Sequence, residues 1–245
     1  QHFLADKNIA RKIVDLLDIT SDDKILEIGS GRGTLTGIIA AQAGALFTFE
    51  IDRDLMQNLE KKFRDNPRVG VIQKDFLKIA PEDYIDGPYK LIGNIPYDIT
   101  SPLLEWITRH RQNLVRAVIT SQKEFAERIA ADPGTKNWAP LSIFCQCRFD
   151  IKVAFDISPK SFYPPPKINS SCLIIEPNDK FIIPDDNIFE SIVRQSFTQR
   201  RKQLVNNLGE YPGLTRETIH NILNDLGLRQ DIRAEHLSIQ DFLNL

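Results

Sequence analysis

The segment Asn94-Ile95-Pro96-Tyr97 has the most informative chemistry in this chain. The side-chain oxygen of Asn94 and the backbone oxygen of Ile95 can accept hydrogen bonds from one amino group. Pro96 restricts the turn, and Tyr97 offers an aromatic face. An amine on an aromatic ring is a poor nucleophile because its lone pair is delocalised. Two acceptors outside the ring plane favour a pyramidal nitrogen, so the segment predicts catalysis by positioning and electrostatics. The alternative is a turn that uses asparagine and proline only for its geometry.

A glycine-rich segment, Glu27-Ile28-Gly29-Ser30-Gly31-Arg32-Gly33, forms the second group of interest. Glycines tolerate positive φ angles and let a ligand approach the backbone closely. Dinucleotide-binding turns use similar residues to present amide groups to a pyrophosphate. The segment alone does not choose between NAD and another adenosine-bearing cofactor, and a turn without a ligand is the alternative.

Two acidic residues, Glu50 and Asp75, are expected where successive strands end. Carboxylates there can accept hydrogen bonds from the hydroxyls of a ribose and the amino group of an adenine. Because ligands bind at the carboxyl edge of a parallel sheet, glycines, Glu50 and Asp75 together predict a nucleoside cofactor.

The elements that position these residues alternate between strand and helix patterns. Apolar runs predict strands, and amphipathic spacing predicts the helices between them. This alternation predicts an α/β fold with a mostly parallel, Rossmann-like sheet and helices on both faces. Expected strands cover 24–28, 45–51, 69–73, 89–93, 114–120 and 169–176; expected helices cover 5–18, 34–43, 53–63, 101–109 and 122–131. Residues 141–157 remain ambiguous between helix and strand before they alternate.

A change of character after Pro177 predicts a domain boundary. Residues 158–168 are too rich in proline for a helix or a central strand. Beyond the boundary, the segments 186–208, 215–226 and 234–243 predict short helices. We therefore expect a catalytic domain over 1–177 and a small helical domain over 178–245.

Composition sets further limits on the function. Of the 245 residues, 42% are hydrophobic and 26% are charged, a composition typical of a globular protein. This composition excludes a disordered chain and a collagen-like fold. No apolar run reaches about 18 residues, so we expect no membrane span. Three cysteines without zinc spacing favour a reducing compartment, the cytoplasm, and no metal site. Residues 100–173 hold 10 basic and 6 acidic side chains, which makes them the candidate polyanion-binding region.

Taken together, these motifs resemble the ribosomal RNA adenine N6-methyltransferases, which use S-adenosylmethionine. Later segments resemble the branch that dimethylates small-subunit rRNA, and the resemblance spans nearly the whole chain. The motifs that carry it are Gln1-His2-Phe3-Leu4, Glu27-x-Gly29-x-Gly31, Glu50, Asp75, Asn94-Ile95-Pro96-Tyr97, Thr100-Ser101-Pro102-Leu103, Gln122-Lys123-Glu124, Ala126-Glu127-Arg128, Pro133-Gly134-Thr135-Lys136, Phe162-x-Pro164-Pro165-Pro166-Lys167, Phe197-x-x-Arg200-Arg201-Lys202 and Arg233-x-Glu235-x-Leu237-Ser238. Erythromycin-resistance methylases of large-subunit rRNA share the first motifs and fit the later ones less well.

The resemblance implies a set of site residues. Glu50 would hold the ribose of S-adenosylmethionine and Asp75 its adenine amine, in a cofactor site that comprises His2, Leu4, Gly29, Glu50, Asp75 and Asn94. The catalytic set would be Asn94, Ile95, Pro96, Tyr97 and Phe162, with Tyr97 and Phe162 stacking on a flipped adenine. For Phe162, the residues alone leave a core position and a stacking position equally open.

The implied reaction is N6,N6-dimethylation of two adjacent adenines near the 3′ end of small-subunit rRNA. The partner would be an assembling small subunit, bound by a monomer that needs no membrane. Phosphate contacts are expected at Lys123, Arg128, Lys136, Arg200, Arg201 and Lys202, with plain surface charge as the alternative. Basic residues that usually precede the first motif are missing, and part of the RNA-binding surface is expected to be missing with them. The rival functions are a large-subunit methylase that confers macrolide resistance and a non-catalytic assembly or transcription factor.

Overall fold

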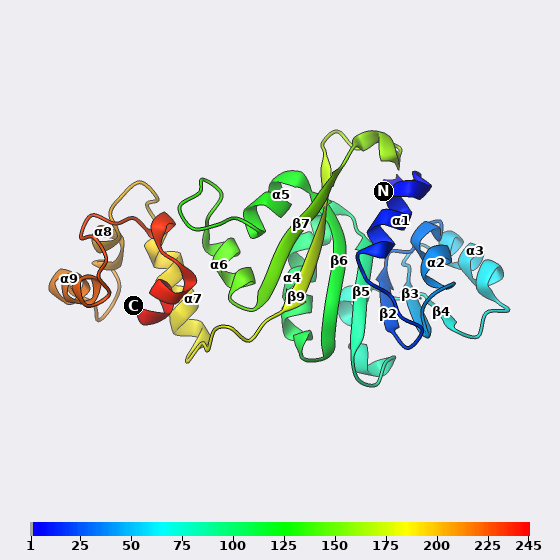
Figure 1. Cartoon of the computed structure of the whole chain (residues 1–245), viewed down its shortest axis with the longest axis horizontal. Helices are drawn as coiled ribbons and strands as arrows, with labels where there is room; N and C mark the ends of the chain where they lie inside the picture. Colours follow the sequence, from blue (N-terminus) through cyan, green and yellow to red (C-terminus); the bar gives the residue numbers. More distant parts are fainter. Residues whose placement is uncertain (1) are drawn as a thin grey trace. The chain divides into compact units, whose positions relative to one another are not determined.

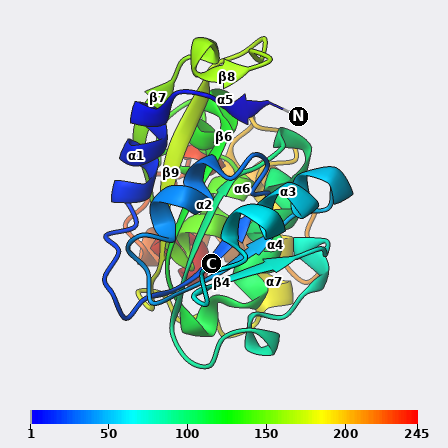
Figure 2. The same ribbon diagram turned by 90° about the vertical axis from the view of Figure 1, so that its right-hand side faces the viewer.

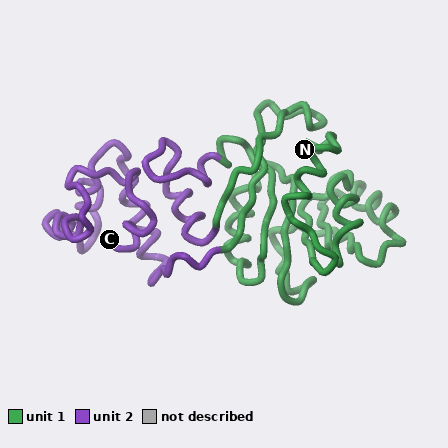
Figure 3. The backbone as a smooth tube through the Cα atoms, in the orientation of Figure 1, with its two compact units in different colours: residues 1–126, 150–177 green, residues 127–149, 178–245 purple. Residues whose placement is uncertain are grey.

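The structure of the protein is a computed structural model that describes residues 2–245; Gln1 of the first motif lies outside them. The chain forms two compact units (Figure 3). The first comprises residues up to 126 together with 150–177, and the second comprises 127–149 and 178–245. The expected single boundary near residue 177 therefore differs from these units, because residues 127–149 also belong to the second unit. They do so because Trp138, Ile143 and Cys147 are buried in its core.

The first unit is built on a seven-stranded sheet with the order β4-β3-β2-β5-β6-β9-β7 (Figure 1). Adjacent pairs from β4 to β6 are parallel, and β9 pairs antiparallel with β6. The predicted mostly parallel α/β sheet is confirmed. The strands are β2 (Lys24–Ile28), β3 (Ala45–Phe49), β4 (Val69–Ile72), β5 (Tyr89–Asn94), β6 (Leu114–Gln122), β7 (Phe149–Ile157) and β9 (Ser170–Pro177).

Helices cover both faces of this sheet. The helices that begin in the first unit are α1 (Lys7–Asp15), α2 (Thr34–Ile39), α3 (Arg53–Phe63), α4 (Thr100–Arg109) and α5 (Lys123–Ile129). Apolar residues of α1 and α2 share one core with Leu46 of β3. Phe49 lies three positions after Leu46, so it faces the other side, where its ring contacts Phe76. Phe76 in turn contacts Trp106 of α4, which places α4 on that opposite face.

A two-stranded sheet joins the N-terminal segment to the proline-rich loop (Figure 2). Strand β1 (Phe3–Leu4) pairs antiparallel with β8 (Phe162–Tyr163), with Leu4 opposite Phe162. The hydroxyl of Thr34 donates to the Leu4 carbonyl over 3.2 Å. These bonds hold the start of the chain beside the turn that follows β2.

The second unit is helical and has its own core. Its helices are α6 (Pro140–Gln146), α7 (Asp186–Ser196), α8 (Leu204–Leu208), α9 (Arg216–Asp225) and α10 (Ile239–Asn244). The ambiguous region 141–157 resolves into α6 followed by β7, and Pro140 stands in the first turn of α6, where no backbone donor is needed. The buried indole of Trp138 donates to the Leu237 carbonyl over 3.0 Å, which ties 127–149 to the C-terminal helices.

Candidate active site

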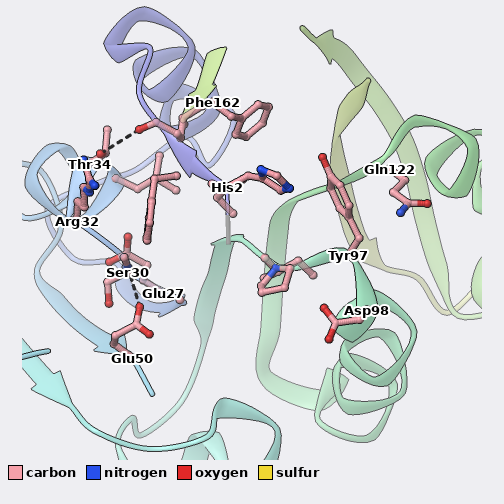
Figure 4. A pocket seen from close by; sticks show the side chains of 18 residues that line it. His2, Glu27, Ser30, Arg32, Thr34, Glu50, Tyr97, Asp98, Gln122 and Phe162 are labelled. Carbon is pink, nitrogen blue, oxygen red and sulfur yellow. Dashed lines mark hydrogen bonds between the residues drawn. The ribbon is translucent and has the colours of Figure 1, made fainter. Parts of the chain in front are cut away.

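A cavity of about 760 Å³ lies in the first unit, where the carboxyl ends of β2, β3 and β5 meet. In Figure 4, Glu27, Ser30 and Glu50 lie on one side of His2, and Tyr97 and Gln122 lie on the other. The lining residues are His2, Phe3, Leu4, Glu27, Gly29, Ser30, Gly31, Arg32, Thr34, Leu35, Glu50, Asn94, Ile95, Pro96, Tyr97, Asp98, Gln122 and Phe162. One wall thus comes from the glycine-rich turn and the other from the Asn94 segment.

The glycine-rich turn follows a path that side chains would obstruct. Gly29 and Gly31 have φ angles of +65° and +54°, in the left-handed region that favours glycine. A Cβ atom on Gly31 would lie 3.0 Å from a ring carbon of Phe3. The Gly29 amide donates to the Phe49 carbonyl over 2.9 Å, which fixes the turn against the end of β3.

Glu50 binds the turn through its side chain. Its Oε2 atom accepts the Gly31 amide at 2.8 Å, and its Oε1 atom accepts the amides of Ile51 and Asp52 at 2.9 and 3.1 Å. A carboxylate has about four acceptor positions. Three are used here, so the position remaining on Oε2 is available to a hydroxyl in the cavity.

Asp75 differs from the other predicted cofactor residues, since it is not among those that line the cavity. Its carboxylate caps the short helical turn Phe76–Lys78 by accepting the Leu77 amide at 3.1 Å. Its other oxygen lies 3.4 Å from Lys78 Nζ. Asp75 follows β4, which is next to β3. A contact between Asp75 and an adenine amine stays a prediction.

Glu27 lines the cavity, although the sequence analysis placed it in a motif without giving it a role in the site. Its side chain is only 1% exposed, lines the cavity and accepts the hydroxyls of Thr36 and Thr48 at 2.7 and 2.8 Å. Burial raises the pKa of Glu27 to about 7, although the hydrogen bonds from the two threonines oppose this shift. A lone glutamate within the apolar strand Lys24–Ile28 was the available signal.

Asn94 ends β5 with both ends of its side-chain amide hydrogen-bonded. Its Oδ1 atom accepts the hydroxyl of Thr120 at 2.7 Å, and its Nδ2 atom donates to the His2 carbonyl at 3.2 Å. The predicted acceptor atom therefore has one partner within the protein. An amide oxygen has two lone pairs, so a second one is available to an amine.

Aromatic and imidazole rings surround the same part of the cavity. The Tyr97 hydroxyl is 2.6 Å from Ser170 Oγ, and the His2 ring lies 6.4 Å from the Tyr97 ring, centroid to centroid. His2 Nδ1 is 2.7 Å from the Pro164 carbonyl oxygen. Phe162 is 5% exposed, belongs to the apolar core and also lines the cavity. Phe162 therefore occupies a core position at the wall of the cavity, and its stacking on a base stays a prediction.

The predicted phosphate-binding residues fall into both units. In the first unit, Lys123 forms an ion pair with Asp156. In the second, Arg128, Lys136, Arg201 and Lys202 are exposed.

Arg200, also in the second unit, binds other groups of the protein through its guanidinium. Its guanidinium lies 2.9 Å from Glu235 and also donates to the Lys136 carbonyl. It fastens the loop that carries Lys136, so its role is at least partly structural.

The remaining expectations concern membrane spans, metal sites and cysteines in residues 2–245. No helix there is both long and apolar enough for a bilayer, and no three metal-binding side chains gather there. Burial raises the pKa of the Cys145 thiol and of the Cys172 thiol to about 12. The thiols are therefore protonated and unreactive at neutral pH.

Comparison with known proteins gives concordant matches. The profile of the family described as "Ribosomal RNA adenine dimethylase" matches residues 1–245. A "Ribosomal RNA small subunit methyltransferase A" of Geobacter metallireducens is 37% identical over 252 residues, covering 100% of this chain and 92% of the relative. One of the same name from Pediococcus pentosaceus is 36% identical, covering 100% and 86%.

Two solved structures share the fold over almost the whole chain. A dimethyladenosine transferase from Plasmodium falciparum has a TM-score of 0.87 at 25% identity, covering 99% of this chain and 95% of that one. The 23S rRNA methyltransferase ErmE has a TM-score of 0.81 at 25% identity, covering 99% and 97%.

The raised pKa of Glu27 predicts a pH-dependent stability. Between the ordinary pKa of 4.5 and about 7, the folded protein holds a proton that the unfolded chain releases, so its free energy of unfolding falls as pH rises. Glu27→Gln lacks this proton. Its free energy of unfolding, relative to wild type, should rise by about 2 kcal/mol from pH 5 to pH 7 in urea titrations. The exposed control Glu105→Gln should show no such rise. If Glu27→Gln showed no rise either, the raised pKa of Glu27 would be contradicted.

Proposed function

The chain belongs to the ribosomal RNA adenine dimethylase family, and from this premise we propose that it dimethylates N6 of two adjacent adenines near the 3′ end of small-subunit rRNA. The methyl donor is S-adenosylmethionine and the substrate an assembling small subunit, which a monomer binds in the cytoplasm. Asn94 carries the proposal, because it lies at the carboxyl end of β5, lines the cavity and keeps an acceptor position on Oδ1.

The cavity fits a nucleoside cofactor. Its volume of about 760 Å³ is typical of small-molecule sites. Gly29 and Gly31 carry no side chain, so a ligand in the cavity can approach their backbone closely. The acceptor position that remains on Glu50 suits a ribose hydroxyl. When bound, S-adenosylmethionine supplies an electrophilic methyl group on a positively charged sulfur. The residues that would hold it are His2, Leu4, Gly29, Glu50 and Asn94, with Asp75 at the end of the neighbouring strand.

The target amine is held by acceptors of the Asn94 segment. Asn94 Oδ1 and the Ile95 carbonyl accept its two hydrogens, while Tyr97 and Phe162 stack on the flipped adenine ring. These contacts direct the nitrogen lone pair at the methyl carbon. When bound, the cofactor would supply the methyl group and keep the electron pair of the C–S bond, while Asn94 and Ile95 would hold the attacking nitrogen, which would then release one proton to water. After the first transfer a single N–H remains, so the second transfer uses only one of the two acceptors.

The comparisons favour small-subunit rRNA over the rival substrates. The relatives with 36–37% identity carry small-subunit names, whereas the large-subunit enzyme ErmE is 25% identical. A factor that only binds RNA would not need Asn94 and Tyr97 in a cavity large enough for a cofactor. Mapping of methylated adenines after incubation of the protein with immature small subunits and isotope-labelled cofactor tests the proposal. Labelled dimethyladenine in small-subunit rRNA is the expected product, and methylation confined to large-subunit rRNA would overturn it.

Glu50 provides a test of the cofactor site. Glu50→Gln replaces one acceptor oxygen by an NH2 group that must face backbone amides, since both oxygens now accept them. We expect Glu50→Gln and Glu50→Ala each to weaken S-adenosylmethionine binding at least tenfold, about 1.4 kcal/mol, in calorimetry. Exposed Glu60→Gln is the matched control. Unchanged affinity in a folded Glu50 variant would remove this residue from the site.

Asn94 provides a test of the chemistry. Asn94→Ala should lose most of the single-turnover rate, because the amine loses an acceptor in the transition state. RNA affinity should change little, since phosphate contacts dominate binding. Rapid-quench methylation assays and filter binding measure the two quantities. Full single-turnover activity of Asn94→Ala on a competent small-subunit substrate is incompatible with the mechanism.

RNA binding is best tested at exposed side chains other than Arg200, because Arg200 also fastens the Lys136 loop. The double reversal Arg201→Glu/Lys202→Glu should weaken small-subunit binding and reduce its salt dependence, with cofactor affinity unchanged. Lys61→Glu/Arg64→Glu, at the end of α3 in the first unit, makes the same change of charge as a control. Equal subunit binding by the two double variants would argue against phosphate contacts at Arg201 and Lys202.

A further inference from the structure

We propose that Thr120 is a positioning residue for catalysis: its hydroxyl fixes the orientation of the Asn94 amide and so presents Oδ1 to the target amine. The inference rests on the proposed methylation of an adenine amine. It adds a residue of β6 that does not line the cavity and that none of the sequence motifs contains.

The register of the sheet brings the two side chains together. β5 and β6 are parallel, and Asn94 is the direct partner of Thr120 in the ladder. Paired residues of neighbouring strands point to the same face, and the Thr120 hydroxyl reaches Asn94 Oδ1 at 2.7 Å. Thr120 is 1% exposed, so a flipped base cannot touch it and any effect on catalysis must pass through Asn94.

The His2 carbonyl decides which way the amide faces. A carbonyl oxygen only accepts hydrogen bonds, so the Asn94 atom at 3.2 Å from it must be the NH2 group. The reversed amide would place two oxygens against each other. With Nδ2 committed to His2, Oδ1 faces Thr120, and the threonine must donate its single hydroxyl hydrogen. The two bonds together allow one orientation of the Asn94 amide.

This orientation matters because the target amine is a donor. Oδ1 can receive one of its hydrogens, whereas a reversed amide would oppose it with a second NH2 group. Without Thr120, only the longer bond to the His2 carbonyl would hold Asn94. Strand β6 is paired on both sides, with β5 and with β9, so the hydroxyl holds the acceptor in place before the substrate arrives.

Thr120→Val tests the role of the hydroxyl, because valine keeps the shape of threonine and its preference for strands. We expect Thr120→Val to lower the single-turnover methylation rate at saturating cofactor at least tenfold, with RNA affinity within about twofold of wild type. Thr120→Ser keeps the hydroxyl and should stay within about threefold of the wild-type rate. Thr108→Val is the matched control: it removes a partly buried hydroxyl that donates to the Leu104 carbonyl in α4, and it should leave the rate unchanged.

A double-mutant cycle with Asn94→Ala separates positioning from a general structural effect. If Thr120 acts through Asn94, Thr120→Val should cause no further loss of rate in the Asn94→Ala background. Losses that multiply would overturn the proposal, as would a wild-type rate in Thr120→Val or a tenfold loss in Thr120→Ser.

The NMR signal of the Asn94 side-chain NH2 group provides a readout that needs no activity. We expect a sharp pair of resonances in wild type and Thr120→Ser, and a shifted or exchange-broadened pair in Thr120→Val, assigned by their loss in Asn94→Asp. Wild-type protein that fails to methylate small-subunit rRNA would refute the proposed function. An Asn94 signal that is the same in all three proteins would refute the role of Thr120 independently.

Discussion

The parallel pairing of β2 with both β3 and β5 is the constraint on which the site depends. The chain leaves β2 for β3 on one side, whereas β5, which follows β4 in the chain, pairs with β2 on the other side. The loops after β2 and β5 therefore diverge and leave a crevice at the carboxyl ends of these strands. Gly29, Glu50 and Asn94 stand at the carboxyl ends of β2, β3 and β5. The three residues therefore line one cavity at the carboxyl edge of the sheet.

The polar groups of the site are held by buried partners, many of them hydroxyls. Glu27 accepts Thr36 and Thr48, Asn94 accepts Thr120, and the Tyr97 hydroxyl meets Ser170. A buried polar group without a partner costs about 1–3 kcal/mol, so each of these bonds also contributes to folding. Among the described residues, no fully buried side-chain nitrogen or oxygen lacks a partner. The polar side chains that line the cavity are thus held in place by partners within the protein.

The N-terminal segment completes the wall of the cavity. β1 pairs with β8, and the His2 carbonyl accepts the Asn94 amide. His2 also contacts the Pro164 carbonyl through its ring. One short segment therefore connects the proline-rich loop, the glycine-rich side of the cavity and the residue proposed to hold the target amine. The helical second unit has a separate core and contributes exposed basic residues.

Most strands and helices of the first unit, and the residues that follow its strands, could be predicted from local periodicity and turn chemistry. The pairing of β1 with β8 was not predicted, and the expected helix 186–208 is two helices, α7 and α8. The same local patterns predicted Gly29, Glu50, Asp75 and the Asn94 segment as one site, and of these Asp75 does not line the cavity. Tertiary structure decided the partners of these residues, which lie up to 92 positions away. The register of β5 and β6 brings Thr120 to Asn94, burial in the folded protein is the main cause of the raised pKa of Glu27, and packing assigns 127–149 to the second core. Contacts between distant segments depend on register and packing, and no local pattern encodes them.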